Sequence, residues 1–183
     1  MKKRKEISDI LKANEAIARK FFKIESILPN ILNVKELFEE IVIQLEEEFH
    51  IPFVWVSIIN KDETADLIKI LSASKILEER LNTIDQATFL NLVSYSTTPV
   101  LVNDDLKPFY RLLPQNRKFF IRSLAVAPIT LNDEIIGSFN HGDFSHLRYQ
   151  PGMDTSLLQK LTSNISSLLS HLMKRENLLP PVS

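Results

Sequence analysis

The hydrophobic pattern of the chain is clearest between residues 121 and 143, where it predicts two long neighbouring strands. Residues 122–130 and 135–141 are rich in side chains that suit a pleated sheet, and a Leu-Asn-Asp turn joins them. Apolar residues lie on both faces of the first strand, so both faces are expected to meet apolar partners. The pattern therefore predicts an antiparallel pair of strands at the centre of a sheet that helices cover.

A helical period with a heptad repeat runs from residue 6 to residue 28. One seam position holds Ile7, Asn14, Phe21 and Leu28, and the other holds Ile10, Ile17, Ile24 and Ile31. A seam with a single central Asn is typical of a short parallel coiled coil, in which the Asn specifies the register at some cost in stability. We expect this stripe to pair with a second copy of the chain. The alternative is an amphipathic helix that packs on its own domain.

A second helix and a first pair of strands follow. Asn33 lies three residues before Glu36, which is the spacing of a capping box, and Pro52 ends the helix that it begins. Residues 53–60 read as a strand, and residues 67–71 are expected to pair with it across a polar hairpin.

The second half of the chain supplies further covering elements. We predict a helix over residues 83–96, a short strand at 99–103 and an aromatic and basic helical loop at 108–114. A final leucine-rich helix is expected to begin at Asp154 or Thr155, either of which can cap it.

This order of elements predicts an α+β fold with three parts. A dimerisation helix occupies residues 1–29, one domain occupies residues 30–176, and a flexible tail occupies residues 177–183. The domain is expected to hold a largely antiparallel central sheet of five to six strands, flanked by N- and C-terminal helices.

Composition excludes several classes of partner. The 183 residues carry a formal net charge of -1, which gives no general electrostatic attraction to nucleic acid or to an anionic membrane. There is no cysteine, so disulfides and thiolate chemistry are excluded. No apolar run has the length of a membrane span, and we expect a cytoplasmic protein without nucleic-acid or membrane partners.

Patterns that indicate catalysis are weak. Three glycines are too few and too scattered for a dinucleotide or phosphate loop. His141, Asp143 and His146 are close in sequence but lack the spacing of a metal site, and Asp104 and Asp105 are adjacent residues that are expected to point apart. We expect neither a metal site nor an enzyme.

Two segments carry a resemblance to a known family. The sequence R-S-L-A-V-A-P-I, a short turn and then E-I-I-G-S-F resembles the closing strands of a GAF domain. Residues 144–161, F-x-x-x-R-Y-x-P-G-M-D-T-x-x-L-x-x-L, are similar to the C-terminal signature of a GAF-like bacterial family numbered 484 among the domains of unknown function. The resemblance covers residues 33–172 and implies a sensory or regulatory module, often dimeric, that binds a small molecule on one face of its sheet.

This resemblance does not choose a ligand, because GAF domains differ widely in what they bind. Without cysteine the chain cannot hold a bilin through a thioether or act as a thiol-dependent GAF-type methionine sulfoxide reductase. The Asn60-Lys61 pair is similar to a motif of cyclic-nucleotide-binding GAF domains, but its place in a predicted turn explains its polarity.

Eight residues are the candidates for a ligand site. They come from the first strand, the helical loop and the two central strands, and they are Trp55, Ser57, Tyr110, Arg117, Arg122, Ser123, Phe139 and His141. Arg117 and Arg122 are the expected contacts for an anion, because the guanidinium fork suits carboxylate and phosphate. The alternatives are a protein-interaction or dimerisation module with no small-molecule ligand, and a hydrolase that uses His141 and Asp143.

Overall fold

The computed structural model describes residues 2–113 and 120–178. Its α-helices are α1 (Lys2–Ile27), α2 (Val34–Phe49), α3 (Ala65–Ser72), α4 (Gln86–Leu92) and α5 (Ser156–Arg175). Its strands are β1 (Phe53–Ile59), β2 (Leu81–Ile84), β3 (Val100–Val102), β4 (Ser123–Leu131) and β5 (Glu134–Asp143). Short 3-10 turns lie at Leu28–Asn30, Asp62–Thr64 and Lys107–Phe109.

The five strands form one mixed sheet in the order β2-β1-β5-β4-β3. All neighbours are antiparallel except β1 and β2, which run parallel. The predicted central pair is confirmed, because β4 and β5 are adjacent and antiparallel over most of their length. Asn132 and Asp133 make the turn between them with φ angles of 50° and 67°, the left-handed pair that a tight hairpin requires.

The predicted strand at residues 67–71 is wrong, because this segment is the helix α3. Leu67 and Leu71 are four residues apart, so a helix places both on one face, where both are fully buried. The Thr64 hydroxyl donates to the Ile59 carbonyl and accepts from the Lys61 amide, which turns the chain before the helix. The neighbour of β1 on this side is instead β2, which the sequence pattern did not identify.

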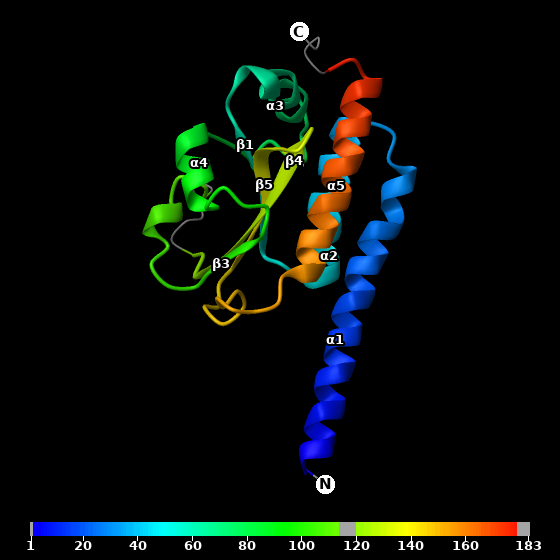
Figure 1. Ribbon diagram of the computed structural model, residues 1–183, viewed down its shortest axis with the longest axis vertical. Coiled ribbons are helices and arrows are strands. Elements are labelled where there is room, and N and C mark those ends of the chain that lie inside the picture. Colours follow the sequence, from blue (N-terminus) through cyan, green and yellow to red (C-terminus); the bar gives the residue numbers. More distant parts are fainter. Residues whose placement is uncertain (1, 114–119, 179–183) are drawn as a thin grey trace.

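Helices and loops cover opposite faces of the sheet (Figure 1). We call the face that α2, α5 and the end of α1 cover the helix face; its core includes Phe38, Ile41 and Leu169. We call the other the loop face; α4 and residues 106–113 cover it, over a core that includes Trp55 and Phe89. Burial on both faces explains why the central strands have no clean alternation of polar and apolar residues.

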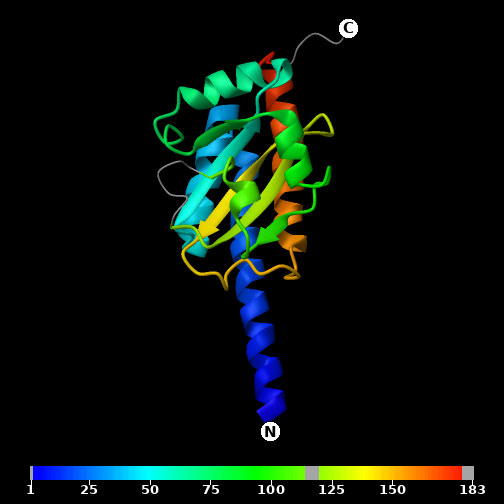
Figure 2. The same ribbon diagram turned by 90° about the vertical axis from the view of Figure 1, so that its left-hand side faces the viewer.

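The helix α1 has two parts with different surroundings. Its N-terminal part extends well beyond the domain, whereas its C-terminal part lies beside α2 and α5 (Figures 1 and 2). Ile24 and Leu28 are buried in the core of the chain's own domain, as is Ile31 after the helix. The expectation that these residues belong to an intermolecular seam is therefore wrong. Their side chains are already buried within the chain's own core, which is where most helices gain their stability.

The predicted start of α2 is confirmed. The Asn33 side chain accepts a hydrogen bond from the Glu36 amide at 2.9 Å, and the Glu36 carboxylate accepts from the Leu32 amide at 2.9 Å. One N–H group of the first helical turn is thereby satisfied, and the second bond holds the residue before the cap. Within the described residues, no helix combines the length and apolar character needed to cross a membrane.

Gly137 gives a direct test of the central packing. A Cβ at this position would lie 2.1 Å from the Ser57 carbonyl oxygen, so Gly137→Ala must push β1 and β5 apart. We expect it to lower the free energy of unfolding by about 3 kcal/mol or more, measured by chemical denaturation. Gly142→Ala is the comparison, because its Cβ would meet side chains and no backbone atom: Ile121 at 2.9 Å, whose end can move, and the Trp55 ring at 3.1 Å, which need give only a few tenths of an ångström. Equal losses in the two variants would contradict this account.

Candidate functional site

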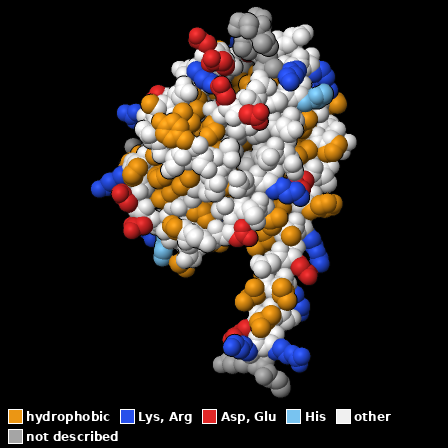
Figure 3. Space-filling model, in the orientation of Figure 1, with side chains coloured by type: hydrophobic (Ala, Val, Ile, Leu, Met, Phe, Trp, Pro, Cys, Tyr) orange, Lys and Arg blue, Asp and Glu red, His pale blue; other side chains and the backbone are white. Residues whose placement is uncertain are grey.

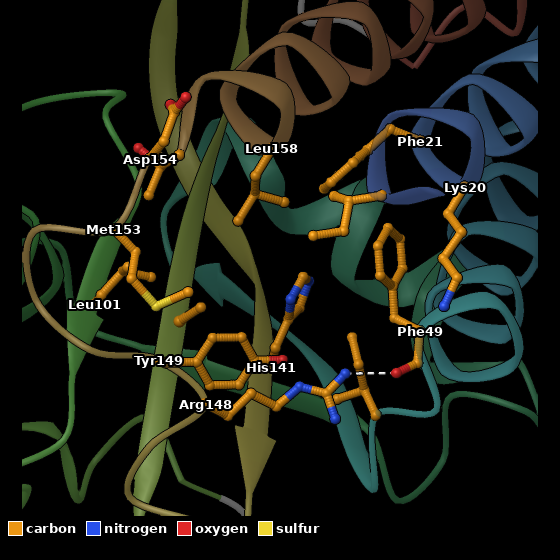
Figure 4. Close-up of a pocket in the computed structure, with 14 residues that line it drawn as sticks. Lys20, Phe21, Phe49, Leu101, His141, Arg148, Tyr149, Met153, Asp154 and Leu158 are labelled. Atoms are coloured by element: carbon orange, nitrogen blue, oxygen red, sulfur yellow. Dashed lines mark hydrogen bonds between the residues drawn. The ribbon is translucent and has the colours of Figure 1, made fainter. Parts of the chain in front are cut away.

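A cavity of about 370 Å³ lies on the helix face, at the end of the sheet where β5 finishes (Figure 4). It is lined by residues of α1, of the C-terminal end of α2, of the strands β3, β4 and β5, of the segment that leads into α5, and of the first turn of α5. Its walls are mainly apolar and are formed by Ile17, Phe21, Phe49, Ile51, Leu101 and Leu158. We call it the helix-face cavity.

His141 is the polar residue that β5 turns toward this cavity. It lies opposite Ala125 on β4 and Val54 on β1, so the pleat places its side chain on the helix face. His141 is only 4% exposed, and its Nε2 atom has no hydrogen-bond partner among the residues that the structure describes. Burial, and secondarily the positive charge of Arg148, lowers the pKa of His141 to about 3. His141 is therefore neutral at physiological pH.

Arg148 fixes the loop that follows β5. Its guanidinium donates to the carbonyl oxygen of Phe49 (Figure 4). It also donates to the carbonyl oxygen of His50 and to the Asp143 carboxylate, the last at 2.9 Å. The two carbonyls belong to the C-terminal end of α2, where the helix dipole favours a cation. The Arg148 guanidinium thus bonds to groups of the protein itself and connects α2, β5 and the loop after β5.

Tyr149 closes the cavity beside His141. The two ring centroids are 6.0 Å apart with an interplanar angle of 57°, and the tyrosine ring extends toward the imidazole in Figure 4. Its hydroxyl is buried and makes no hydrogen bond of acceptable geometry with the described residues. Burial raises the pKa of Tyr149, so the phenol stays protonated and neutral. The Arg148 guanidinium lies close enough to this hydroxyl to oppose part of that rise in pKa. His141 Nε2 and the Tyr149 hydroxyl thus meet in one cavity, and neither has a well-formed hydrogen bond to the described residues.

Aromatic side chains from two helices form the opposite wall. Phe21 of α1 and Phe49 of α2 pack with their ring centroids 4.8 Å apart. The Lys20 ammonium lies 5.6 Å from the centroid of the Phe49 ring, in cation–π contact. A molecule in the cavity would contact the N-terminal helix directly, because α1 contributes Ile17, Lys20 and Phe21 to the lining.

The eight candidate residues do not share one pocket. Trp55 and Ser57 lie on the loop face, where the Trp55 indole donates to the Leu112 carbonyl at 2.7 Å. Ser57 accepts from the Asn140 side-chain amide at 2.9 Å, and Ser138 donates to Asn140 at 2.7 Å. These polar groups on the loop face are buried but have partners, in contrast to His141.

The remaining candidates are divided among other surroundings. Phe139 stacks on Phe38 of α2 in the helix-face core, with ring centroids 5.4 Å apart. The Ser123 hydroxyl donates to the Ser145 carbonyl at 2.6 Å, and Arg122 and Tyr110 are exposed. Arg117 lies outside the described residues. Of the seven candidates that the structure describes, only His141 lines the helix-face cavity. The predicted convergence failed because strand residues of opposite parity were assigned to one face.

The sequence interpretation missed Arg148 and Tyr149, and also the wall that α1 contributes. Both residues lie in the segment 144–161 that carries the family resemblance, so an Arg-Tyr pair inside that signature was the available signal. The position of the Arg148-Tyr149 pair next to β5 depends on how the loop after β5 folds back to α2.

The described residues contain no group of three or more His, Asp or Glu side chains placed to hold a metal ion. His146 is exposed, and Asp143 is paired with Arg148 rather than with a histidine. Asp104 accepts a hydrogen bond from the Asp105 amide, as in a turn.

Comparison with known proteins identifies the architecture. No protein-family model matches the chain, and no curated protein matches it in sequence. The free methionine-R-sulfoxide reductase of Neisseria meningitidis, solved with its substrate, superposes with a TM-score of 0.56 and 13% identity, over 88% of this chain and 93% of the reductase. The GAF domain of the Acinetobacter phosphoenolpyruvate-protein phosphotransferase superposes with a TM-score of 0.55 and 9% identity, over 87% of this chain and 96% of that domain. The fold is GAF-like. At these identities the comparisons show the fold alone. The proteins that share this fold include both an enzyme and a GAF domain.

Filling the helix-face cavity tests whether it is real. Ala125 lines the cavity, whereas Ala127, two residues along the same strand face, does not. We expect Ala125→Leu to leave the free energy of unfolding within about 1 kcal/mol of the wild type, because the added atoms occupy empty space. Ala127→Leu should cost about 1 to 3 kcal/mol, because it overpacks a filled core. Chemical denaturation of both variants gives the comparison, and a large loss for Ala125→Leu would show that no such space exists.

The neutral state of His141 predicts a pH dependence of stability. A histidine in the unfolded chain has a pKa of about 6.5, whereas the pKa of His141 in the folded protein is lowered to about 3. Between these values only the unfolded chain takes up the proton, so stability is fully present above the unfolded pKa and is lost as pH falls. In this range His141 lowers the free energy of unfolding by about 1.4 kcal/mol for each unit by which the pH falls.

His141→Gln should remove this slope. Between pH 6 and pH 4, its free energy of unfolding should fall less steeply than that of the wild type by about 1.4 kcal/mol per unit. The control is His171→Gln, at an exposed position on α5, which should keep the wild-type slope. Parallel curves for wild type and His141→Gln would contradict burial of a neutral imidazole.

Proposed function

We propose that this chain is a non-enzymatic sensory or regulatory module of GAF-like fold, which binds a small molecule in the helix-face cavity and acts as a homodimer. One observation carries the ligand-binding part: the cavity holds two buried polar groups, His141 Nε2 and the Tyr149 hydroxyl, that have no partner within the described residues. Buried polar groups are nearly always hydrogen-bonded, so an unpaired couple in a cavity indicates a missing partner. The volume of about 370 Å³ suits a small molecule.

Binding is favoured over catalysis by the surroundings of His141. A histidine that acts as a base is normally held by hydrogen bonds to a nucleophile and to an orienting group. Within the described residues His141 makes neither bond, and its neighbour Asp143 is engaged with Arg148. The hydrolase hypothesis for His141 and Asp143 thus gains no support from the geometry.

The homodimer is proposed for the projecting part of α1. The seam residues Ile7, Ile10 and Ile17 are between 44% and 60% exposed there, and Leu11 beside them is 57% exposed. Hydrophobic side chains are visible along this projecting segment in Figure 3. A second copy of α1 in parallel would cover these residues and set Asn14 against its symmetry mate, which favours a single register.

This arrangement connects the ligand with the dimer. Ile17 lines the cavity and also belongs to the exposed stripe, and Phe21 extends the same helix face into the domain. A ligand that binds one position of α1 better than another would shift the helix toward that position, and the dimer would transmit the shift.

A single substitution in the stripe tests the dimer in the full chain. Ile10→Asp should weaken dimerisation by about 100-fold or more, because each protomer loses roughly 1.5 to 3 kcal/mol of apolar burial. Ser8→Asp, which places the same charge outside the seam, should leave it unchanged. Sedimentation equilibrium at several concentrations gives both affinities. Substitution is preferable to removal of the helix, because Ile24 and Leu28 belong to the core. If Ile10→Asp dimerises as tightly as Ser8→Asp, the seam is not the interface.

Native mass spectrometry of the purified protein tests the ligand site. We expect the wild type to carry a bound small molecule, or to be stabilised by one in a thermal-shift screen of metabolites. Ala125→Leu should lose that signal because it fills the cavity, and Ala73→Leu, at an exposed position after α3, should keep it. A molecule retained by Ala125→Leu would place the binding site elsewhere.

The alternative is a protein-interaction module without a small-molecule ligand. Exposed apolar residues at the junction of α1 and α5 favour it: Phe22 is 72% exposed, and Leu157 is 36% exposed beside it. The absence of any bound or stabilising molecule in the experiment above would support this alternative.

A further inference from the structure

The unpaired groups in the helix-face cavity define the chemistry that would satisfy them. His141 as a neutral imidazole has one donor and one acceptor nitrogen, and the Tyr149 hydroxyl can donate or accept. Their rings lie 6.0 Å apart between centroids, on one side of the cavity. A ligand group with a donor or an acceptor, such as a ring N–H, a hydroxyl or an amide, complements this pair.

The charged residues around the cavity are already engaged. Arg148 is paired with Asp143 and with two backbone carbonyls. Asp154 accepts a hydrogen bond from the Ser156 amide, and Lys20 stacks over Phe49. The Lys20 ammonium and the Asp154 carboxylate keep their charges but lie on other walls of the cavity (Figure 4). An ionised group placed beside His141 itself would therefore lose its water without a free counter-ion next to it, which is unfavourable.

The shape and surface of the cavity favour a flat apolar body. Phe21 and Phe49 form a tilted aromatic pair on one wall, and Tyr149 and His141 present their rings from the other side (Figure 4). Aromatic rings pack well against such walls in offset or edge-to-face contact. The volume lies near the lower end for small-molecule pockets, so a body of one or two rings is the suitable size.

We propose that the helix-face cavity takes an uncharged, planar aromatic or heteroaromatic molecule, whose single polar group hydrogen-bonds to His141 and Tyr149. This inference rests on the proposed ligand-binding function and adds the class of ligand to it. The molecule lies between the sheet and α1, in contact with Phe21, while its polar group points toward β5.

Three probes of similar shape separate the contributions. Indole is uncharged and has one N–H group, indene is a carbocyclic analogue without it, and indole-3-acetate adds a negative charge. Isothermal titration calorimetry on the full-length wild type should show that indole binds about tenfold more tightly than either analogue. The thermal shifts at equal probe concentration should follow the same order.

Variants test whether the preference arises from these two residues. Tyr149→Phe and His141→Gln should each reduce the preference for indole over indene, by about threefold or more. Tyr110→Phe removes a hydroxyl at an exposed position and should preserve it. Ala125→Leu should abolish binding of all three probes.

The outcomes distinguish this inference from the function on which it rests. If indole-3-acetate binds at least as tightly as indole, the ligand class is wrong, although the cavity is a binding site. If no probe binds while Ala125→Leu still removes a co-purified molecule, the class is again wrong and the proposed function stands. Probe binding that persists in Ala125→Leu, or an indole preference that survives both Tyr149→Phe and His141→Gln, would overturn the assignment.

Discussion

Burial of β5 on both faces is the constraint on which the arrangement of this protein depends. Every polar side chain on the strand must find a partner inside the protein or remain unsatisfied at a cost. On the loop face Ser138 donates to Asn140, and Asn140 donates to Ser57 on β1. On the helix face His141 Nε2 has no such partner in the described part of the chain. The difference between the two faces is what supports the proposal that the cavity is a binding site.

The loop after β5 builds the rest of that site. Arg148 binds the C-terminal carbonyls of α2 and the Asp143 carboxylate, so the loop is held across the end of the sheet. This position carries Tyr149 next to His141 and completes the enclosure. One arginine thus anchors a helix end, a strand end and the wall of the cavity.

The helix α1 links the cavity to the proposed dimer because its two parts have different partners. Ile24 is part of the domain core, Phe21 and Ile17 line the cavity, and the stripe further toward the N-terminus is exposed. A continuous helix transmits displacement along its length, since its backbone hydrogen bonds resist bending. The same helix therefore lines the proposed ligand site and carries the proposed partner surface.

The sequence was sufficient for the elements with strong local signals. The hairpin of β4 and β5, the Asn33 cap and the leucine-rich α5 follow from β-propensity, capping chemistry and helical periodicity, and they led to the α+β, GAF-like fold. The segment at residues 67–71 was misread, because five apolar-rich residues after a polar turn fit a strand or a helix equally well. The packing of Leu67 and Leu71 decided the matter.

Of the predicted site, the sequence by itself identified His141 but not its surroundings. The face to which a strand residue points depends on register, and a shift of one residue reverses it, so Trp55 and Ser57 were placed with His141 although they lie across the sheet. Likewise the heptad of α1 determined an apolar stripe, whereas only the packing of α2 and α5 decided which part is core and which is exposed. Periodicity can be read from neighbouring residues anywhere in the chain. A cavity or an exposed surface, in contrast, depends on whether segments distant in sequence pack against each other.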